Sequence, residues 1–133
     1  MTQRILIMGL PGSGKTYFAE RLKKYLESFS CFFHMPMDRS VNLERLPSKW
    51  QAKVDWFNAD DIRRKYNDWD FSRDGRIRQS LRMLEFSMNC TGDFVICDFV
   101  APLPEMRHNF KADWTIWMDS IDFGRFDDTN KAF

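Results

Sequence analysis

The sequence GLPGSGKT at positions 9–16 constrains the fold of this chain more than any other feature. It matches the pattern G-x-x-x-x-G-K-[ST], which forms a phosphate-binding loop when a strand precedes it and a helix follows. Positions 5–8 are apolar, as in a buried strand, and apolar residues after the motif recur every three or four positions up to Phe29. This spacing predicts an amphipathic helix over 15–28, so both required flanking elements are present.

Each residue type in the motif has a chemical reason. Glycines let the backbone curl until successive N–H groups face phosphate oxygens, and the following helix adds the positive end of its dipole. The alternative is a glycine-rich turn that binds nothing. The lysine and threonine at the last two motif positions make that alternative less favourable. Lys15 is expected to reach the β- and γ-phosphates of ATP, and the Thr16 hydroxyl to bind Mg²⁺. The predicted ATP-binding residues in the motif are Gly9, Pro11, Gly12, Ser13, Gly14, Lys15 and Thr16.

Composition limits what can be built around this loop. A chain of 133 residues with 44% hydrophobic residues fits one domain with a real core. Twenty Lys and Arg residues against nineteen Asp and Glu give a formal charge of +1, so nucleic acid is not an expected partner. The apolar runs are too short for a signal peptide or a membrane span, and the three cysteines lack metal-ligand spacing. We expect a cytoplasmic protein without membrane contact, and the sequence leaves a homodimer open.

Strands and helices alternate along the chain. Helices are expected from Ala59, across 77–89 and at 105–111. Residues 29–53 contain two prolines and no single period, so we treat them as an irregular insertion without assigned chemistry. The alternation predicts an α/β fold for residues 1–133, with helices on both faces of a short parallel sheet and right-handed crossovers. The four visible strands are predicted at 4–9, 54–58, 94–99 and 113–118.

Two charged residues follow the strand at 54–58. Asp60 and Arg63 are three positions apart, so they project from the same side of a helix. That strand end lies beside the phosphate loop at the carboxyl edge of a parallel sheet. A carboxylate there can orient an attacking hydroxyl or hold Mg²⁺-bound water, and an arginine can bind an anionic substrate. The alternative, an N-capping aspartate with an exposed ion-paired arginine, is common, but the adjacent loop favours catalytic roles for Lys15, Asp60 and Arg63.

Asp98 ends the apolar run at 94–99 and is expected at the same edge, so Thr16, Asp60 and Asp98 are the predicted metal ligands. Phe71 precedes several arginines near one helix start, an arrangement that can clamp a planar anion by stacking and ion pairing. For Arg78, a solvated basic face is the favoured interpretation.

The order GLPGSGKT, FNADDIR, DFSRDGRIRQSLR, VICDFVAPLPEMR and TIWMDS resembles the adenylylsulfate kinases. These enzymes transfer the γ-phosphate of ATP to the 3′-hydroxyl of adenosine 5′-phosphosulfate in sulfate assimilation. The resemblance covers most of the chain outside 29–53, and it implies a three-layer P-loop kinase-like fold with the first strand between the third and fourth. It also implies Mg²⁺, ATP and a small anionic nucleotide substrate. The implied site residues are Asp60 as the catalytic aspartate, Arg63 at the phosphosulfate, Phe71 on the adenine, and Arg76, Gln79, Val100, Ala101 and Pro102 in the same pocket.

Three departures from that family leave other functions open. The insertion at 29–53 is longer than usual, and Asp98 replaces a small hydroxyl residue, as in polynucleotide 5′-kinases. The family's lysine-rich lid is not recognisable near the C-terminal end, where Arg125 and Lys131 are candidates for what remains of it and Arg125 is a predicted ATP-binding residue. The alternatives are a polynucleotide 5′-hydroxyl kinase-like enzyme, which needs a basic channel, and a catalytically weak nucleotide-binding module in a shortened chain.

Overall fold

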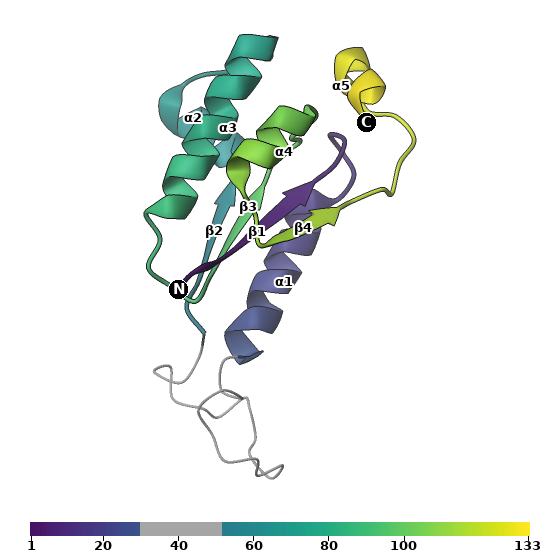
Figure 1. Ribbon diagram of the computed structural model, residues 1–133. Helices are drawn as coiled ribbons and strands as arrows, with labels where there is room; N and C mark the ends of the chain where they lie inside the picture. The colour runs from purple at the N-terminus through teal and green to yellow at the C-terminus, as the bar shows by residue number, and fades with distance from the viewer. Residues whose placement is uncertain (30–51) are drawn as a thin grey trace, which may run out of the picture.

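A computed structural model describes residues 1–29 and 52–133 of the chain (Figure 1). The predicted irregular insertion lies almost wholly outside the described residues, so its structure stays a prediction. The elements in chain order are β1 (Gln3–Met8), α1 (Lys15–Phe29), β2 (Val54–Asn58), α2 (Ala59–Tyr66), α3 (Arg73–Met88), β3 (Phe94–Asp98), α4 (Pro104–Phe110), β4 (Trp114–Trp117) and α5 (Asp127–Ala132).

The four strands form one parallel sheet in the order β2-β3-β1-β4. Strand β1, which leads into the phosphate loop, therefore lies between the third and fourth strands, as predicted. The register places Asp98 beside Ile7 on one side and beside Asn58 on the other. Because parallel strands end at the same edge, the residues that follow β1, β2 and β3 meet there.

Helices cover both faces of the sheet (Figure 1). In β1, Ile5 and Ile7 face α1, while Leu6 and Met8 face the layer formed by α2, α3 and α4, as the twofold alternation of a strand requires. Both faces of β1 are buried, which explains its continuous apolar sequence. None of the described helices is long and apolar enough to cross a bilayer.

Two helices differ from the prediction, one in its extent and one in not being expected at all. Helix α3 starts at Arg73 rather than Ile77, because the Ser72 hydroxyl caps it by accepting a hydrogen bond from the Gly75 N–H at 3.2 Å. A Cβ at Gly75 would lie 2.3 Å from the carbonyl oxygen of Asp70, so only glycine lets the preceding loop pack this closely. Helix α5 was not predicted, since its six residues are mostly polar and show no apolar period.

Candidate functional site

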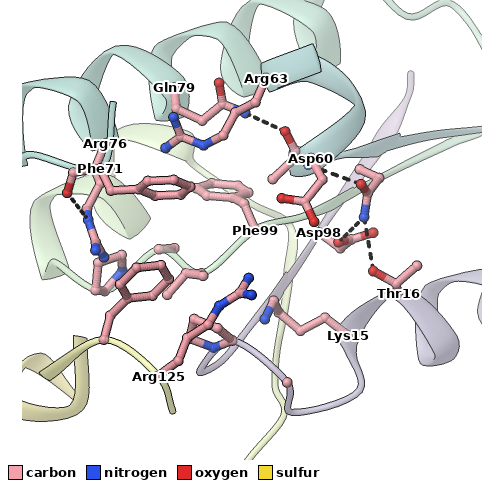
Figure 2. A pocket seen from close by; sticks show the side chains of 18 of the residues that line it. Lys15, Thr16, Asp60, Arg63, Phe71, Arg76, Gln79, Asp98, Phe99 and Arg125 are labelled. Carbon is pink, nitrogen blue, oxygen red and sulfur yellow. Dashed lines mark hydrogen bonds between the residues drawn. The ribbon is translucent and has the colours of Figure 1, made fainter. Parts of the chain in front are cut away.

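A cavity of about 410 Å³ opens at the carboxyl edge of the sheet (Figure 2). Its walls come from the phosphate loop, the β2–α2 junction, the start of α3, the loop after β3 and the segment 119–133. Gly9 and Ser13 are buried within the loop, and Lys131 is exposed on α5. The other predicted site residues line the cavity: Pro11, Gly12, Gly14, Lys15, Thr16, Asp60, Arg63, Phe71, Arg76, Gln79, Asp98, Val100, Ala101, Pro102 and Arg125.

The phosphate loop has a backbone that only glycine adopts readily. Gly12 and Gly14 have φ angles of 86° and 93°, in the region that a side chain disfavours. At Gly9 a Cβ would lie 2.8 Å from the carbonyl oxygen of Met118. Helix α1 begins at Lys15, so the N–H groups of its first residues, up to Tyr17, lack intrahelical acceptors, whereas the Phe18 N–H donates to the Gly14 carbonyl oxygen at 3.0 Å. This cradle fits the phosphates of a nucleotide.

Lys15 holds its ammonium group at the loop, where Nζ donates a hydrogen bond to the carbonyl oxygen of Leu10 at 2.9 Å. Burial lowers the pKa of Lys15, while the carboxylates of Asp98 and Asp60 raise it and the Arg125 guanidinium lowers it further. Figure 2 shows the guanidinium of Arg125 beside this ammonium group. Two cations therefore share one end of the cavity, and a polyphosphate would neutralise both.

Asp98 is the buried carboxylate of the site, with 2% of its surface exposed. Trp56 Nε1 donates to Oδ2 at 2.6 Å and Asn58 Nδ2 donates to Oδ1 at 2.9 Å. Burial raises the pKa of Asp98, and the Trp56 bond, the charge of Lys15 and the Asn58 bond oppose that shift. Asn58 also donates to the Thr16 hydroxyl at 3.0 Å, so it joins Thr16 and Asp98, two of the three predicted metal ligands.

The donor atoms around Thr16 fit Mg²⁺ in a phosphate site. Among the described residues, no group of three or more His, Cys, Asp or Glu side chains could hold a metal ion. Magnesium bound with a nucleotide needs only one or two protein groups, because phosphate oxygens and water supply the remaining ligands. Thr16 and Asp98, joined through Asn58, offer that smaller donor set.

Asp60 stands at the start of α2, and its exposed side chain lines the cavity. Figure 2 shows its carboxylate on the same side of the cavity as Asp98, with Lys15 on the opposite side. An exposed carboxylate facing the phosphate loop is suited to accept a proton from a bound hydroxyl. Its catalytic role stays a prediction.

Arg63 and Phe71 form the far end of the cavity. The guanidinium of Arg63 is centred 4.5 Å from the Phe71 ring, and its Nη1 donates to the carbonyl oxygens of Asp68 and Asp70 at 3.1 and 3.0 Å. Arg63 is only 5% exposed, and burial lowers its pKa. One guanidinium nitrogen thus supports the loop that carries Phe71, a structural role that the sequence did not indicate.

The segment 119–133 completes this end of the cavity. Phe126 stacks on Phe71 with ring centroids 5.2 Å apart and an interplanar angle of 27°. Arg76 donates to the Phe71 carbonyl oxygen at 2.8 Å and pairs with Asp128 at 3.1 Å. Sequence reasoning missed Phe126, because its aromatic partner is distant in the chain and no motif marks it.

Arg125 and Gln79, the remaining polar residues of the cavity wall, differ in whether their side chains are free to contact a ligand. Arg125 lies over the Phe126 ring at 5.3 Å, and within residues 1–29 and 52–133 no carboxylate pairs with it. Gln79 is 3% exposed and donates through Nε2 to the Ala59 carbonyl oxygen at 2.9 Å, which ties α3 to the start of α2. Arg125 therefore has a free guanidinium, while Gln79 has a packing role beside its predicted one.

Comparison with known proteins adds to this geometry. A family model described as "Chromatin associated protein KTI12" matches residues 4–110. The chain belongs to the KTI12 family. No curated protein matches this KTI12-family chain. Its membership corrects the expectation of an adenylylsulfate kinase: the resemblance noted in the sequence extends to the P-loop kinase-like fold and not to that family itself.

Solved structures confirm the predicted α/β fold. "Crystal structure of APE1195" superposes with a TM-score of 0.61 at 22% identity, covering 89% of this chain and 60% of that one. The APS kinase CysC of Mycobacterium tuberculosis in complex with AMPPNP and APS gives 0.62 at 19% identity, covering 89% and 62%. A cysteine mutant of CysC gives 0.60 at 19% identity, covering 96% and 87%. The KTI12-family chain thus spans about three fifths of the first two structures.

Proposed function

We propose that this KTI12-family chain is a Mg²⁺-dependent kinase that transfers the γ-phosphoryl group of ATP to a hydroxyl group of a nucleotide. One observation carries the proposal: Lys15, Thr16, Asp60 and Asp98 line a single cavity with the phosphate loop at one end and an aromatic ring at the other. Because phosphoryl transfer depends mainly on positioning and charge neutralisation, these groups supply what the reaction requires.

Each residue has a defined part in the transfer. Lys15 binds the β- and γ-phosphates, Arg125 approaches them from segment 119–133 beside Lys15, and Thr16 and Asp98 would hold the metal ion and its water. When bound, Mg²⁺ neutralises charge on the phosphate oxygens. Asp60 takes the proton of the acceptor hydroxyl as its oxygen bonds to the γ-phosphorus. The bond from that phosphorus to the bridging oxygen breaks, and ADP leaves.

Adenylylsulfate is the first acceptor to test, with its 3′-hydroxyl as the proposed site of phosphorylation. The partly exposed ring of Phe71 and the arginine at position 76 suit a planar base that carries anionic groups. The sequence motifs resemble those of adenylylsulfate kinases, and the CysC structure was determined with APS bound. A cytoplasmic site of action and a homodimer stay predictions.

A second candidate is a nucleotide-binding module with little or no transfer activity. The observation in its favour is that the Arg63 guanidinium and the Phe126 ring both lie against the Phe71 ring. A base can use the face of Phe71 that Phe126 covers only after Phe126 moves. If Phe126 stays in place, the cavity binds a nucleotide at the phosphate loop without an acceptor.

Labelled ATP tests both candidates. The protein is incubated with γ-labelled ATP and Mg²⁺, together with adenylylsulfate, a 5′-hydroxyl oligonucleotide or no acceptor. Label in adenylylsulfate is the expected result, and label in the oligonucleotide alone would refute the proposed acceptor. ATP binding without label in any acceptor would favour the nucleotide-binding module. Lys15→Ala should abolish any transfer, whereas Lys24→Ala should not, because Lys24 is an exposed lysine of the same helix.

A further inference from the structure

We propose that Asn58 is a positioning residue that assembles the metal site and the catalytic carboxylate as one unit. This inference rests on the proposed phosphoryl transfer, and it gives a role to Asn58, which is not among the site residues predicted from the sequence. Asn58 ends β2 beside Asp98 in the register and immediately precedes α2. It therefore stands where the sheet, the phosphate loop and α2 meet.

All four hydrogen-bonding positions of the Asn58 amide are occupied. Nδ2 donates to Thr16 Oγ1 at 3.0 Å and to Asp98 Oδ1 at 2.9 Å. Oδ1 accepts from the N–H groups of Asp60 and Asp61 at 3.0 and 3.2 Å. A primary amide offers two donors and two acceptor lone pairs, so this side chain has no unused capacity.

The network also fixes which way the amide points. In the reverse orientation its oxygen would face the Asp98 carboxylate and its NH₂ group would face two backbone N–H donors. Both contacts would then be repulsive. Aspartate could cap α2 but could not donate to Thr16 or Asp98. Asparagine thus combines helix capping with two donors in a way that aspartate and serine do not.

The sheet geometry explains why these partners converge. Trp56 and Asn58 are two residues apart on β2, so they point to one face of the sheet, the face covered by α1. Asp98 on the neighbouring strand receives one hydrogen bond from each of them. Both carboxylate oxygens are held, so the plane of the carboxylate is set by β2. Thr16, in the first turn of α1, is reached by the same amide.

This arrangement has two consequences for the reaction. With one lone pair of Thr16 Oγ1 held by Asn58, the other can bind the metal ion. Capping of α2 by Asn58 fixes the backbone of Asp60, so the carboxylate that receives the proton is set relative to the metal site. Groups that orient metal ligands typically change metal affinity or activity by about 10- to 100-fold when they are removed.

The rival explanation is that Asn58 only caps α2, and Asn58→Asp separates the two. This substitution keeps a good cap but removes both donors. Asn67→Asp is the matched control, since Asn67 caps the opposite end of α2 in a left-handed conformation with φ of 48°, where aspartate is tolerated. Asn58→Ser, which keeps a capping oxygen, is the second variant.

The measurements are helix content and melting temperature, binding of AMPPNP with and without Mg²⁺, and kcat and KM for transfer. For Asn58→Asp we expect metal-free AMPPNP affinity within about twofold, a Mg²⁺ half-saturation raised at least about tenfold, and kcat lowered by a similar factor with acceptor KM unchanged. Asn58→Ser should shift the metal dependence in the same direction, and Asn67→Asp should leave it unchanged.

Parent-like metal dependence in folded Asn58→Asp would overturn the proposal, as would an equal shift in Asn67→Asp. If Asn58→Asp fails to fold, the same criterion applies to Asn58→Ser. If the parent protein binds Mg²⁺ and AMPPNP but transfers no phosphate, the proposed function fails, while the binding measurements still decide the role of Asn58. If the parent binds no AMPPNP, both proposals fall.

Discussion

At the phosphate-loop end of the cavity, polar side chains from adjacent strand ends are joined by hydrogen bonds of 2.6 to 3.0 Å. At the far end, aromatic rings and arginines from helices and loops are stacked on one another. The parallel sheet fixes the first set, whereas the second depends on contacts such as the ion pair between Arg76 and Asp128, 52 residues apart in the chain. Substitutions at the two ends should therefore differ in both size and kind of effect.

After the loss of transfer expected for Lys15→Ala, the next largest effect is expected from Asp60→Asn at the phosphate-loop end. Asparagine keeps the size of the side chain but cannot take the proton of the acceptor, so kcat should fall about 10²- to 10⁴-fold with little change in the KM for ATP. The matched control is Asp61→Asn, because Asp61 is an exposed residue of the same helix whose carboxylate pairs with Arg64 at 2.7 Å. Steady-state kinetics of both variants measure kcat and the KM for ATP. Equal losses in the two variants would show that the helix start, and not the carboxylate of Asp60, is responsible.

At the far end of the cavity, Phe71→Ala should change the KM for the acceptor and leave the KM for ATP unchanged. Stacking of a base on an aromatic ring is worth about 1–3 kcal/mol, which corresponds to a KM for the acceptor raised about 5- to 150-fold. The KM for ATP should not change, because the phosphate loop is separate from this ring. Phe123→Ala is the control, since that phenylalanine is 75% exposed. An unchanged acceptor KM would exclude Phe71 as the platform.

The two rings should respond in opposite directions. Phe126 covers a face of Phe71, so Phe126→Ala is expected to free that face and lower the acceptor KM. An aromatic pair is worth about 0.5–1.5 kcal/mol, so the change should lie between about 2- and 12-fold. Acceptor titrations at saturating ATP measure it. A raised KM would instead show that Phe126 contributes a second stacking surface to the bound acceptor.

The same contrast explains what the sequence could predict. The phosphate loop and the α/β fold follow from local motifs and from the alternation of strands and helices, and the meeting of strand ends follows from the parallel sheet. The strand order was implied only by the resemblance to a known kinase family. The sequence did not predict the role of Asn58, because that role depends on the register between β2 and β3, which spacing along the chain does not reveal. Phe126 belongs to a segment whose short helix has no apolar period, and Arg63 could be placed in the cavity but not given its two backbone carbonyl partners.

The smallest effect on activity is expected from Asp68→Asn, in the loop that carries Phe71. Asp68 accepts hydrogen bonds from Arg78 at 2.7 Å and Arg82 at 2.8 Å, and chiefly the Arg78 bond holds the pKa of Asp68 well below its usual range. A carboxylate whose pKa is lower in the folded than in the unfolded state stabilises the fold above its unfolded value of about 3.9 and loses that contribution as pH falls. The melting temperature of the variant should thus be lower than the parent's at pH 7, and the gap should narrow progressively as the pH falls below about 4. Asp122→Asn, on an exposed residue of segment 119–133, should follow the parent at every pH. A gap between Asp68→Asn and the parent that persists at low pH would mean that the side chain acts by packing and not by its charge.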